Sequence, residues 1–359
     1  MSNRFTVVSM QTYGDYLLKA PFIHELFAAH PDAAITIVTN PRGAQVYPLI
    51  DSRLHIVCAD KTESRLNLFA RLRRLPRADV LYVLDQHPGS SVFSMLIRAR
   101  RRVGWYQSIS TLFQGPDAGF RDHYTVRPIL SRLLKLVLDK KYLRSPETQY
   151  EGYVELGLLE SPEIFPRLAQ YRTRYSFPAD PKAEPPLIFC AALASWVARQ
   201  LDDERWMRII SAISSDFPEH RFVIDASDAL ISRFAGNPRI SRLVRSPDLS
   251  DFFRLVSSAA VVICSDSFVA HVASWFDVPA VAFFGPAMPH RFAPTAPGSA
   301  ILYNQPPCSP CVQQRDSRPC LAGYTQCLSL QQLSAEEIVT AVANALPAGR
   351  RNSGPVFPA

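Results

Sequence analysis

A strand–turn–helix–strand pattern at residues 260–286 is the feature that most constrains how this chain folds. The apolar, β-rich run 260–264 is typical of a buried strand, and the run 278–284 predicts a second one. Residues 265–267, Ser-Asp-Ser, end the first run, and apolar side chains then recur at helical spacing. Buried strands joined through a helix are the repeating unit of parallel α/β folds, so we predict such a sheet.

The Ser-Asp-Ser turn has two interpretations. Ser and Asp are favoured helix N-caps, so the turn can be purely structural. A helix N-terminus above a strand end also presents bare N–H groups and the positive end of the helix dipole, which suit a phosphate or diphosphate. The turn alone does not decide between the two.

The residues around the turn resemble the signature of glycosyltransferase family 9, the ADP-heptose:lipopolysaccharide heptosyltransferases. The chain reads D-S-x-x-x-H from Asp266 and F-G-P-x-x-P from Phe284. The family pattern is D-[ST]-G-x-x-H followed by F-G-P-T-x-P. Phe268 therefore replaces a usual Gly, and Ala287 replaces a usual Thr. Both departures fall where the donor's phosphates would be held, which leaves the identity of the donor open.

The resemblance covers nearly the whole chain and implies the GT-B architecture, an α/β fold with two Rossmann-like domains facing a central cleft. We expect an N-terminal acceptor-binding domain at residues 1–165 and a Pro-rich linker at 166–186. A C-terminal nucleotide-sugar-binding domain follows at residues 187–346. The tail at 347–359, rich in Pro, Gly and Arg, is expected to be disordered.

Gly14 and Asp15 lie between a first predicted strand, residues 4–10, and a predicted helix at residues 16–30. In the family the corresponding Asp is the proposed catalytic base. A carboxylate at the carboxyl end of a strand can take a proton from a sugar hydroxyl. Asp is also a good helix cap, but the resemblance favours the base. The GxGxxG fingerprint is absent, which argues against a dinucleotide-dependent oxidoreductase.

The resemblance also implies a donor site in the C-terminal domain. Arg199 takes the position of a basic residue, usually Lys, that holds the donor diphosphate, although it could be an ordinary surface arginine. Arginine keeps the positive charge and adds a planar fork of donors for phosphate oxygens. Asp266 would hold sugar hydroxyls and His271 would support the turn. The expected donor-binding residues are Arg199, Ser265, Asp266, Ser267, Phe268, His271, Gly285 and Pro286.

The positive charge of the chain is uneven. The net charge is +7, and residues 1–180 hold 24 Lys and Arg against 17 Asp and Glu, so this half carries the whole excess. A basic half suggests an anionic partner, although a solvated basic surface is the simpler explanation. A basic amphipathic helix is predicted at 65–77, and the run 98–102 either closes a helix or contacts acceptor phosphate or the membrane surface. The expected acceptor-binding residues are Gly14, Arg101, Arg102, His123 and Arg127.

Seven cysteines fall into two groups. Cys58, Cys190 and Cys264 lie in apolar strand-like runs and are predicted to be inert core thiols. The other four follow the spacing C-x2-C-x8-C-x6-C and are Cys308, Cys311, Cys320 and Cys327. This pattern suggests a tetrahedral thiolate site for structural Zn or Fe, and reduced loop thiols are the alternative. Four thiolates leave no open coordination position, so a metal held there would not be catalytic. Catalysis is expected to need no cofactor, because a helix dipole and a cation can stabilise the departing diphosphate.

The resemblance, together with these features, implies an inverting glycosyltransferase that moves heptose from ADP-heptose to an acidic saccharide, the lipopolysaccharide inner core. The acceptor would be an anionic glycolipid, and nucleic acid is not an expected partner. No uncharged apolar run approaches the roughly 18 residues that cross a bilayer, and the N-terminus lacks a signal-peptide core. We therefore expect a cytoplasmic protein with peripheral contact to the inner membrane.

Two alternatives stay open at this point. The chain could be a glycosyltransferase of the same fold that uses another nucleotide sugar or a protein acceptor. It could also be a catalytically silent scaffold protein.

Overall fold

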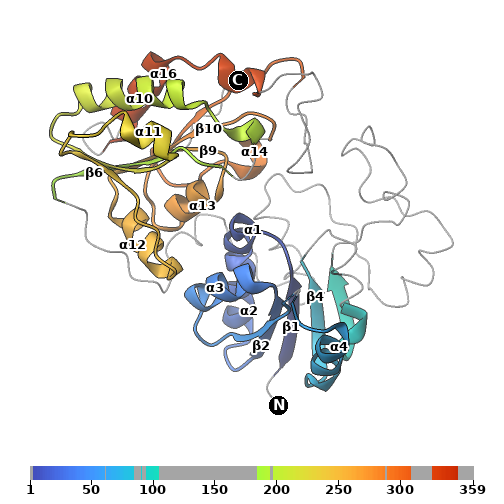
Figure 1. Cartoon of the computed structure of the whole chain (residues 1–359). Coiled ribbons are helices and arrows are strands. Elements are labelled where there is room, and N and C mark those ends of the chain that lie inside the picture. The colour runs from blue at the N-terminus through green and yellow to red at the C-terminus, as the bar shows by residue number, and fades with distance from the viewer. Residues whose placement is uncertain are drawn as a thin grey trace. The chain divides into compact units, whose positions relative to one another are not determined.

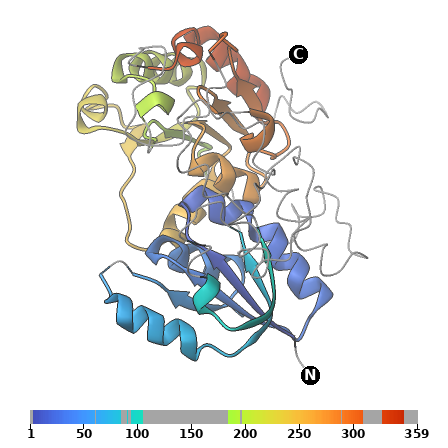
Figure 2. The ribbon, with the colours of Figure 1, turned by 90° about the vertical axis from the view of Figure 1, so that its right-hand side faces the viewer.

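The computed structural model describes residues 3–60, 62–84, 90, 94–104, 184–194, 197–287, 289–308 and 326–346. The chain divides into two units, Met1–Ser176 and Phe177–Ala359, and each is described here by itself (Figures 1 and 2). Of the predicted linker, only residues 184–186 are among the described ones, and the predicted tail lies outside them. No helix within the described ranges is long and apolar enough to cross a membrane.

The N-terminal unit is built on a five-stranded parallel sheet in the order β3-β2-β1-β4-β5. Its strands are β1 (Arg4–Ser9), β2 (Ala34–Thr39), β3 (His55–Cys58), β4 (Ala78–Val83) and β5 (Ala99–Gly104). The direction in which the chain adds strands reverses between β1 and β4. In open α/β sheets, ligands bind beyond the carboxyl ends of the strands at such a switch point.

Helices cover both faces of this sheet (Figure 1). On one face lie α1 (Tyr13–Leu18), α2 (Ala20–Ala29) and α3 (Pro41–Ile50), and on the other lies α4 (Arg65–Arg74). The single helix predicted over residues 16–30 is therefore wrong. The chain forms two helices that meet at Lys19, because Pro21 has no N–H to continue the ladder and instead suits a helix start.

The basic run at residues 98–102 does not close a helix, as was one expectation, but leads into strand β5. β5 is the edge strand of the sheet, where polar side chains can reach solvent. Arg100 there lies 3.4 Å from the carboxylate of Asp79 on β4. Arg102 is partly buried and its guanidinium donates to the carbonyl oxygen of Ile97 at 2.7 Å.

The C-terminal unit has a six-stranded parallel sheet in the order β11-β10-β9-β6-β7-β8. Its strands are β6 (Leu187–Ala191), β7 (Arg221–Asp225), β8 (Ile240–Arg242), β9 (Val261–Ser265), β10 (Ala280–Phe283) and β11 (Ala300–Leu302). The strand order is that of a complete Rossmann fold, with the switch point between β6 and β9. The two strands predicted around the Ser-Asp-Ser turn are confirmed as β9 and β10.

In this unit, α10 (Asp203–Asp216) and α16 (Ala335–Ala345) pack together on one face of the sheet. The other face carries α12 (Leu249–Ser258) and α13 (Phe268–Trp275) (Figure 1). Shorter elements are the 3-10 turn η2 (Val197–Arg199), α11 (Asp228–Ser232), α14 (Pro289–Phe292) and α15 (Leu328–Gln331). The capping box predicted for the last helix is confirmed, because Ser334 and Glu337 exchange hydrogen bonds of 2.8 and 3.1 Å.

Candidate functional site

The switch point of the C-terminal sheet brings together two parts of the predicted donor site. β6 and β9 are neighbours, so their carboxyl ends lie at the same edge. Residues 265–267, called the β9–α13 turn below, follow β9, and η2 follows β6 and ends at Arg199. Nη1 of Arg199 lies 3.3 Å from the carbonyl oxygen of Asp266 and 3.4 Å from its carboxylate Oδ2. Two residues that are 67 positions apart in sequence therefore form one polar site.

The polar atoms of the β9–α13 turn are buried and incompletely bonded. The hydroxyl oxygens of Ser265 and Ser267 and Oδ2 of Asp266 form no hydrogen bond with described residues, and the Arg199 contact to Oδ2 lacks hydrogen-bond geometry. Ser267 is the N-cap residue of α13, yet its side chain makes no capping bond. The purely structural interpretation of the turn therefore does not account for these hydroxyls. Unsatisfied buried polar atoms are rare, and a ligand or a water molecule is the usual explanation.

Phe268, which replaces the usual Gly of the pattern, packs sideways onto α12. Its ring stacks on Phe252 with centroids 5.8 Å apart and lies 6.0 Å from Phe253. Residues at the start of a helix have N–H groups without an intrahelical acceptor, and a side chain that turns toward α12 does not need to cover them. The substitution thus enlarges an aromatic cluster and is compatible with an anion above the helix N-terminus.

The groups beneath the turn are also buried. His271 lies one helical turn into α13 and is 6% exposed, and Asp266 is 4% exposed. Cys264 on β9 and Cys190 on β6 are fully buried free thiols, as predicted, whereas Cys58, predicted to be a core thiol as well, is partly exposed. Burial raises the pKa of Cys190 to about 12. Burial, the Asp266 carboxylate and Cys190 together raise the pKa of Cys264. Both thiols stay protonated near neutral pH, so neither acts as a nucleophile at this site.

The turn after β10 is held by close packing against α15. A Cβ atom added to Gly285 would lie 3.0 Å from Cβ of Cys327 and 3.3 Å from Cγ of Leu330. The hydroxyl of Ser329 donates to the carbonyl oxygen of Phe284 at 2.7 Å. Glycine is therefore needed at residue 285 for packing, and the adjacent Pro286 is also buried.

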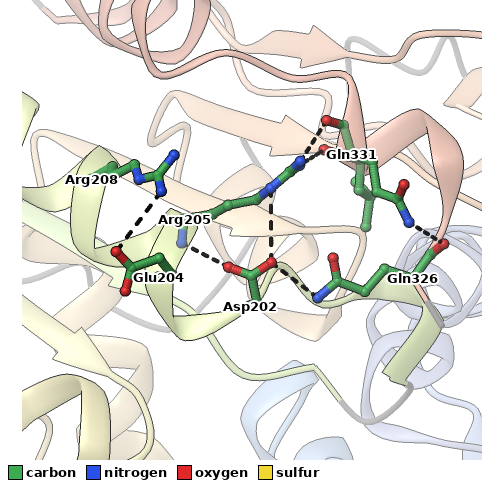
Figure 3. Close-up of polar contacts among 7 residues, drawn as sticks. Asp202, Glu204, Arg205, Arg208, Gln326 and Gln331 are labelled. Carbon is green, nitrogen blue, oxygen red and sulfur yellow. Dashed lines mark hydrogen bonds and ion pairs between the residues drawn. The ribbon is translucent and has the colours of Figure 1, made fainter.

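Arg205 fixes α15 in turn, and this network was not predicted from the sequence (Figure 3). The Arg205 guanidinium on α10 donates to the carbonyl oxygens of Leu330 and Gln331 at 2.7 and 2.6 Å. Asp202 caps α10 through the amide of Arg205 at 2.8 Å, and the side chain of Gln326 donates to the same carboxylate at 3.3 Å. A chain of contacts thus connects α10 through α15 to the turn at Gly285.

In the N-terminal unit, Asp15 lies in the first turn of α1, just beyond β1. Its Oδ2 accepts hydrogen bonds from the amide and the hydroxyl of Thr12, at 3.1 and 2.7 Å. Its Oδ1 accepts none from the described part of the chain. The helix cap and the proposed base, which the sequence presented as alternatives, are therefore compatible, because the cap uses only one carboxylate oxygen.

The loop that precedes Asp15, residues 10–12, is held by a network centred on Lys19, and we call it the β1–α1 loop. Lys19 is completely buried, and its Nζ donates to Oγ of Ser9 at 2.7 Å and to Oε1 of Gln11 at 2.6 Å. The carbonyl oxygen of Gln11 accepts from the hydroxyl of Tyr16 at 2.7 Å and from Asn40 at 3.0 Å. Sequence reasoning missed Lys19, although a lysine inside the apolar run at 16–23 was a signal that could have found it.

The predicted acceptor residues are only partly described. Gly14 is in α1, and Arg101 and Arg102 lie on β5, two strands from β1. Burial lowers the pKa of Arg102. His123 and Arg127 fall outside the described residues.

The predicted metal site is described at two of its four cysteines. Cys308 is exposed, and Cys327 is buried at the N-terminus of α15. Cys311 and Cys320 lie outside the described ranges, and within those ranges no three His, Cys, Asp or Glu side chains gather as metal ligands. The thiolate site stays a prediction.

Comparison of the sequence with protein-family models identifies the family of this chain. A model of glycosyltransferase family 9 (heptosyltransferase) matches residues 65–322. No curated protein matches the chain in sequence.

Solved structures share the fold at low sequence identity. A glycosyl transferase family 9 protein from Veillonella parvula is 15% identical, with 96% of this chain and 97% of that chain covered and a TM-score of 0.66. The ADP-heptose lps heptosyltransferase II of E. coli is 14% identical, with 95% and 98% covered and a TM-score of 0.65. The iron-containing dodecameric glycosyltransferase TibC of enterotoxigenic E. coli is 12% identical, with 96% and 76% covered and a TM-score of 0.58. These likenesses confirm the predicted fold.

Proposed function

The chain belongs to glycosyltransferase family 9, the heptosyltransferase family, and on that premise we propose that it transfers heptose from ADP-heptose to an acidic saccharide with inversion of the anomeric centre. It is a glycosyltransferase with the GT-B fold. The contact between Arg199 and Asp266 at the β6/β9 switch point is the observation that carries the proposal. It combines a cation, a helix N-terminus and buried polar atoms at the edge where Rossmann-like sheets bind nucleotides.

The diphosphate of the donor would lie between Arg199 and the N-terminus of α13. The Arg199 guanidinium is planar and permanently charged, and its five N–H donors suit phosphate oxygens. The hydroxyls of Ser265 and Ser267 would complete their hydrogen bonds on the bound donor, Asp266 would accept from sugar hydroxyls, and His271 would support the turn. Gly285 and Pro286 would shape the neighbouring turn. ADP-heptose is our choice of donor because the E. coli heptosyltransferase II with this fold carries that donor in its name.

Asp15 would act as the general base through Oδ1. The carboxylate takes the proton of an acceptor hydroxyl, and the hydroxyl oxygen attacks the anomeric carbon on the face opposite the diphosphate. The bond from the anomeric carbon to the phosphate oxygen breaks, and ADP leaves with the electron pair. Arg199 and the dipole of α13 stabilise the negative charge on the departing diphosphate, so in this proposal no metal ion takes part in the step.

The acceptor would be the inner core of lipopolysaccharide at the cytoplasmic face of the inner membrane. The positive N-terminal half of the chain supports an anionic acceptor, and the proposed contacts are Gly14, Arg101, Arg102, His123 and Arg127. The four C-terminal cysteines would hold structural Zn or Fe; their spacing and the iron-containing fold relative TibC support this.

A second candidate is transfer from another nucleotide sugar or to a protein acceptor. Ala287, buried beside the turn at Gly285, lacks the hydroxyl of the usual Thr and could change the donor that is held.

A donor panel tests the proposal. Purified protein would be titrated with ADP-heptose, ADP-glucose, UDP-glucose and GDP-mannose, and ADP release would be measured with a heptose-deficient lipopolysaccharide core. We expect selective binding of ADP-heptose, acceptor-dependent release of ADP and an inverted linkage in the product by NMR. Binding and turnover of a different nucleotide sugar would support the second candidate, and absence of turnover with every donor would contradict both.

A further inference from the structure

Helix α4 covers one face of the N-terminal sheet (Figure 1). It also exposes apolar side chains. Leu66 is 81% exposed and Phe69 is 46% exposed, whereas Leu68 and Leu72 pack into the core. Since each helical residue advances by about 100° (3.6 residues per turn), Leu66, Phe69 and Arg73 lie along one side of the helix. Two large apolar side chains on one exposed helix flank mark an interaction surface more clearly than isolated ones do.

Four arginines on α4 or just after it carry positive charge that no acidic side chain in the described part of the chain pairs with. Arg65, Arg73, Arg74 and Arg77 form no ion pair within the described part of the chain, and the guanidinium of Arg73 lies over the Phe69 ring, 5.9 Å from its centroid. No acidic residue occurs from residue 64 to residue 78.

Two neighbouring arginines, Arg71 and Arg98, do have partners in the protein. Arg71 turns to the other side of α4, where it bonds Glu63 at 2.7 Å and the carbonyl oxygen of Cys58 at 3.1 Å. Arg98, just before β5, donates to the carbonyl oxygen of Leu75 at 3.2 Å and so adds its charge at the C-terminal end of the helix. The exposed flank is therefore apolar at its centre and cationic around it.

We propose that this flank of α4 docks the protein on the surface of an anionic lipid bilayer. Leu66 and Phe69 would enter the headgroup region, and Arg65, Arg73 and Arg74 would face lipid phosphates. An interfacial helix needs this combination of apolar and cationic side chains, whereas a soluble polyanion needs the charges alone. The docking surface uses none of the residues of the proposed donor site. The docking proposal can therefore be disproved without affecting the proposed transfer reaction, and the transfer reaction can be disproved without affecting the docking proposal.

Vesicle flotation of the full chain tests the docking surface. Wild-type protein is expected to float with phosphatidylglycerol:phosphatidylethanolamine vesicles and to stay at the bottom with phosphatidylcholine vesicles. Each arginine near an anionic surface strengthens vesicle binding about fivefold. The double variant Arg65→Gln with Arg73→Gln is therefore expected to bind vesicles about 25-fold more weakly. Leu66→Ser with Phe69→Ser is expected to weaken it by about tenfold or more, because the apolar contact is lost.

Val244 provides the matched control. It is 87% exposed in the C-terminal unit and also lies between two arginines, but Arg242 and Arg245 are paired with Asp228 and Asp225. Val244→Ser should leave vesicle binding unchanged, and all variants should keep the wild-type Tm and circular dichroism spectrum because the altered side chains are exposed.

Three results would overturn the proposal. The first is a wild-type protein that does not float with anionic vesicles. The second is equal loss of binding in Val244→Ser and in the Leu66/Phe69 double variant. The third is a Leu66/Phe69 double variant that binds as wild type while the arginine variant does not, which would assign the surface to a soluble polyanion.

Discussion

The two switch-point segments of the molecule satisfy their polar groups in opposite ways. The β1–α1 loop is closed on itself, because Lys19, Tyr16 and Asn40 bond its backbone and side chains and Thr12 bonds Asp15. The β9–α13 turn also follows a strand that borders the switch point of its sheet, on the other side of that point from the first strand, β6. There, two serine hydroxyls and one carboxylate oxygen are buried without a hydrogen bond from described residues.

The difference fits two different proposed roles. The β1–α1 loop would hold one residue, Asp15, in place, whereas the β9–α13 turn would bind a ligand. A general base works best when its position is fixed before the substrate arrives, and the hydrogen bonds of the β1–α1 loop hold Asp15, the proposed base, in this way. A binding site gains affinity and selectivity when its polar atoms find partners only on the ligand. The comparison predicts that mutations in the two segments will affect stability with opposite signs.

The largest expected effect is on catalysis. Asp15→Asn keeps an oxygen that can accept from Thr12 but removes the base, so we expect kcat to fall by about 10²–10⁴ while Tm stays near the wild-type value. Steady-state kinetics with ADP-heptose and a lipopolysaccharide core acceptor measure this. A variant that keeps kcat within a factor of about three would remove Asp15 from the mechanism, since loss of a general base costs about 10²–10⁴.

Lys19→Met tests the closed loop. Methionine has a similar length but cannot donate to Ser9 and Gln11 as Lys19 does. The free energy of unfolding should therefore fall by about 1–3 kcal/mol. Chemical denaturation gives the free energy of unfolding, and Lys19→Arg serves as the comparison that keeps the donor. If Lys19→Met were as stable as wild type, the network would not be what holds the β1–α1 loop.

Serine and threonine substitutions compare the two segments directly. Ser265→Ala with Ser267→Ala removes unsatisfied hydroxyls and should raise the stability of the ligand-free protein by about 1 kcal/mol, while ADP affinity falls about fivefold. Thr12→Ala removes a bonded side chain at a helix start and should lower stability by about 1 kcal/mol. Thermal unfolding with and without ADP measures both. If the Ser265/Ser267 double variant lost stability as Thr12→Ala does, the proposed difference between the β9–α13 turn and the β1–α1 loop would be wrong.

The smallest effect concerns thiol reactivity. Burial raises the pKa of both Cys58 and Cys264, but Cys58 is partly exposed and Cys264 is fully buried. Because the thiolate is the reactive form, raising the pH from about 7 to 9 should speed alkylation of Cys58 and leave Cys264 and Cys190 unlabelled until the protein is denatured. Peptide mapping by mass spectrometry reads each site. Native labelling of Cys264 would show that the strand beneath the turn is accessible.

Much of the architecture was predictable because buried parallel strands leave continuous apolar runs in the sequence. The runs at 260–264 and 278–284 became β9 and β10, and the capping box at Ser334 began a helix as expected. The helix break at Lys19 was missed, although Pro21 signalled it. The possible helix end at residues 98–102 was wrong, because pairing with β4 at the sheet edge outweighs the preference of arginine for helix ends.

The candidate site was predictable in part. The signature residues drew attention to the β9–α13 turn, and strand order then explains why Arg199 reaches it from the neighbouring strand. Arg205 could not be assigned in the same way, because an arginine in a helix is usually exposed. Its importance depends on what it contacts in the fold, and single-sequence patterns do not contain that information. Lys19 was missed although its place inside an apolar run was a signal.

Calorimetric titration of ADP into wild-type protein, Arg199→Ala and Arg208→Ala tests the central claim most directly. Arg208 is an exposed arginine on α10 of the same unit and serves as the matched control. The account predicts that Arg199→Ala weakens ADP binding by about tenfold or more, since a charged hydrogen bond contributes about 1.5–3 kcal/mol, and that Arg208→Ala binds as wild type. Equal ADP affinity in Arg199→Ala and wild type would contradict the placement of the donor diphosphate at the β6/β9 switch point.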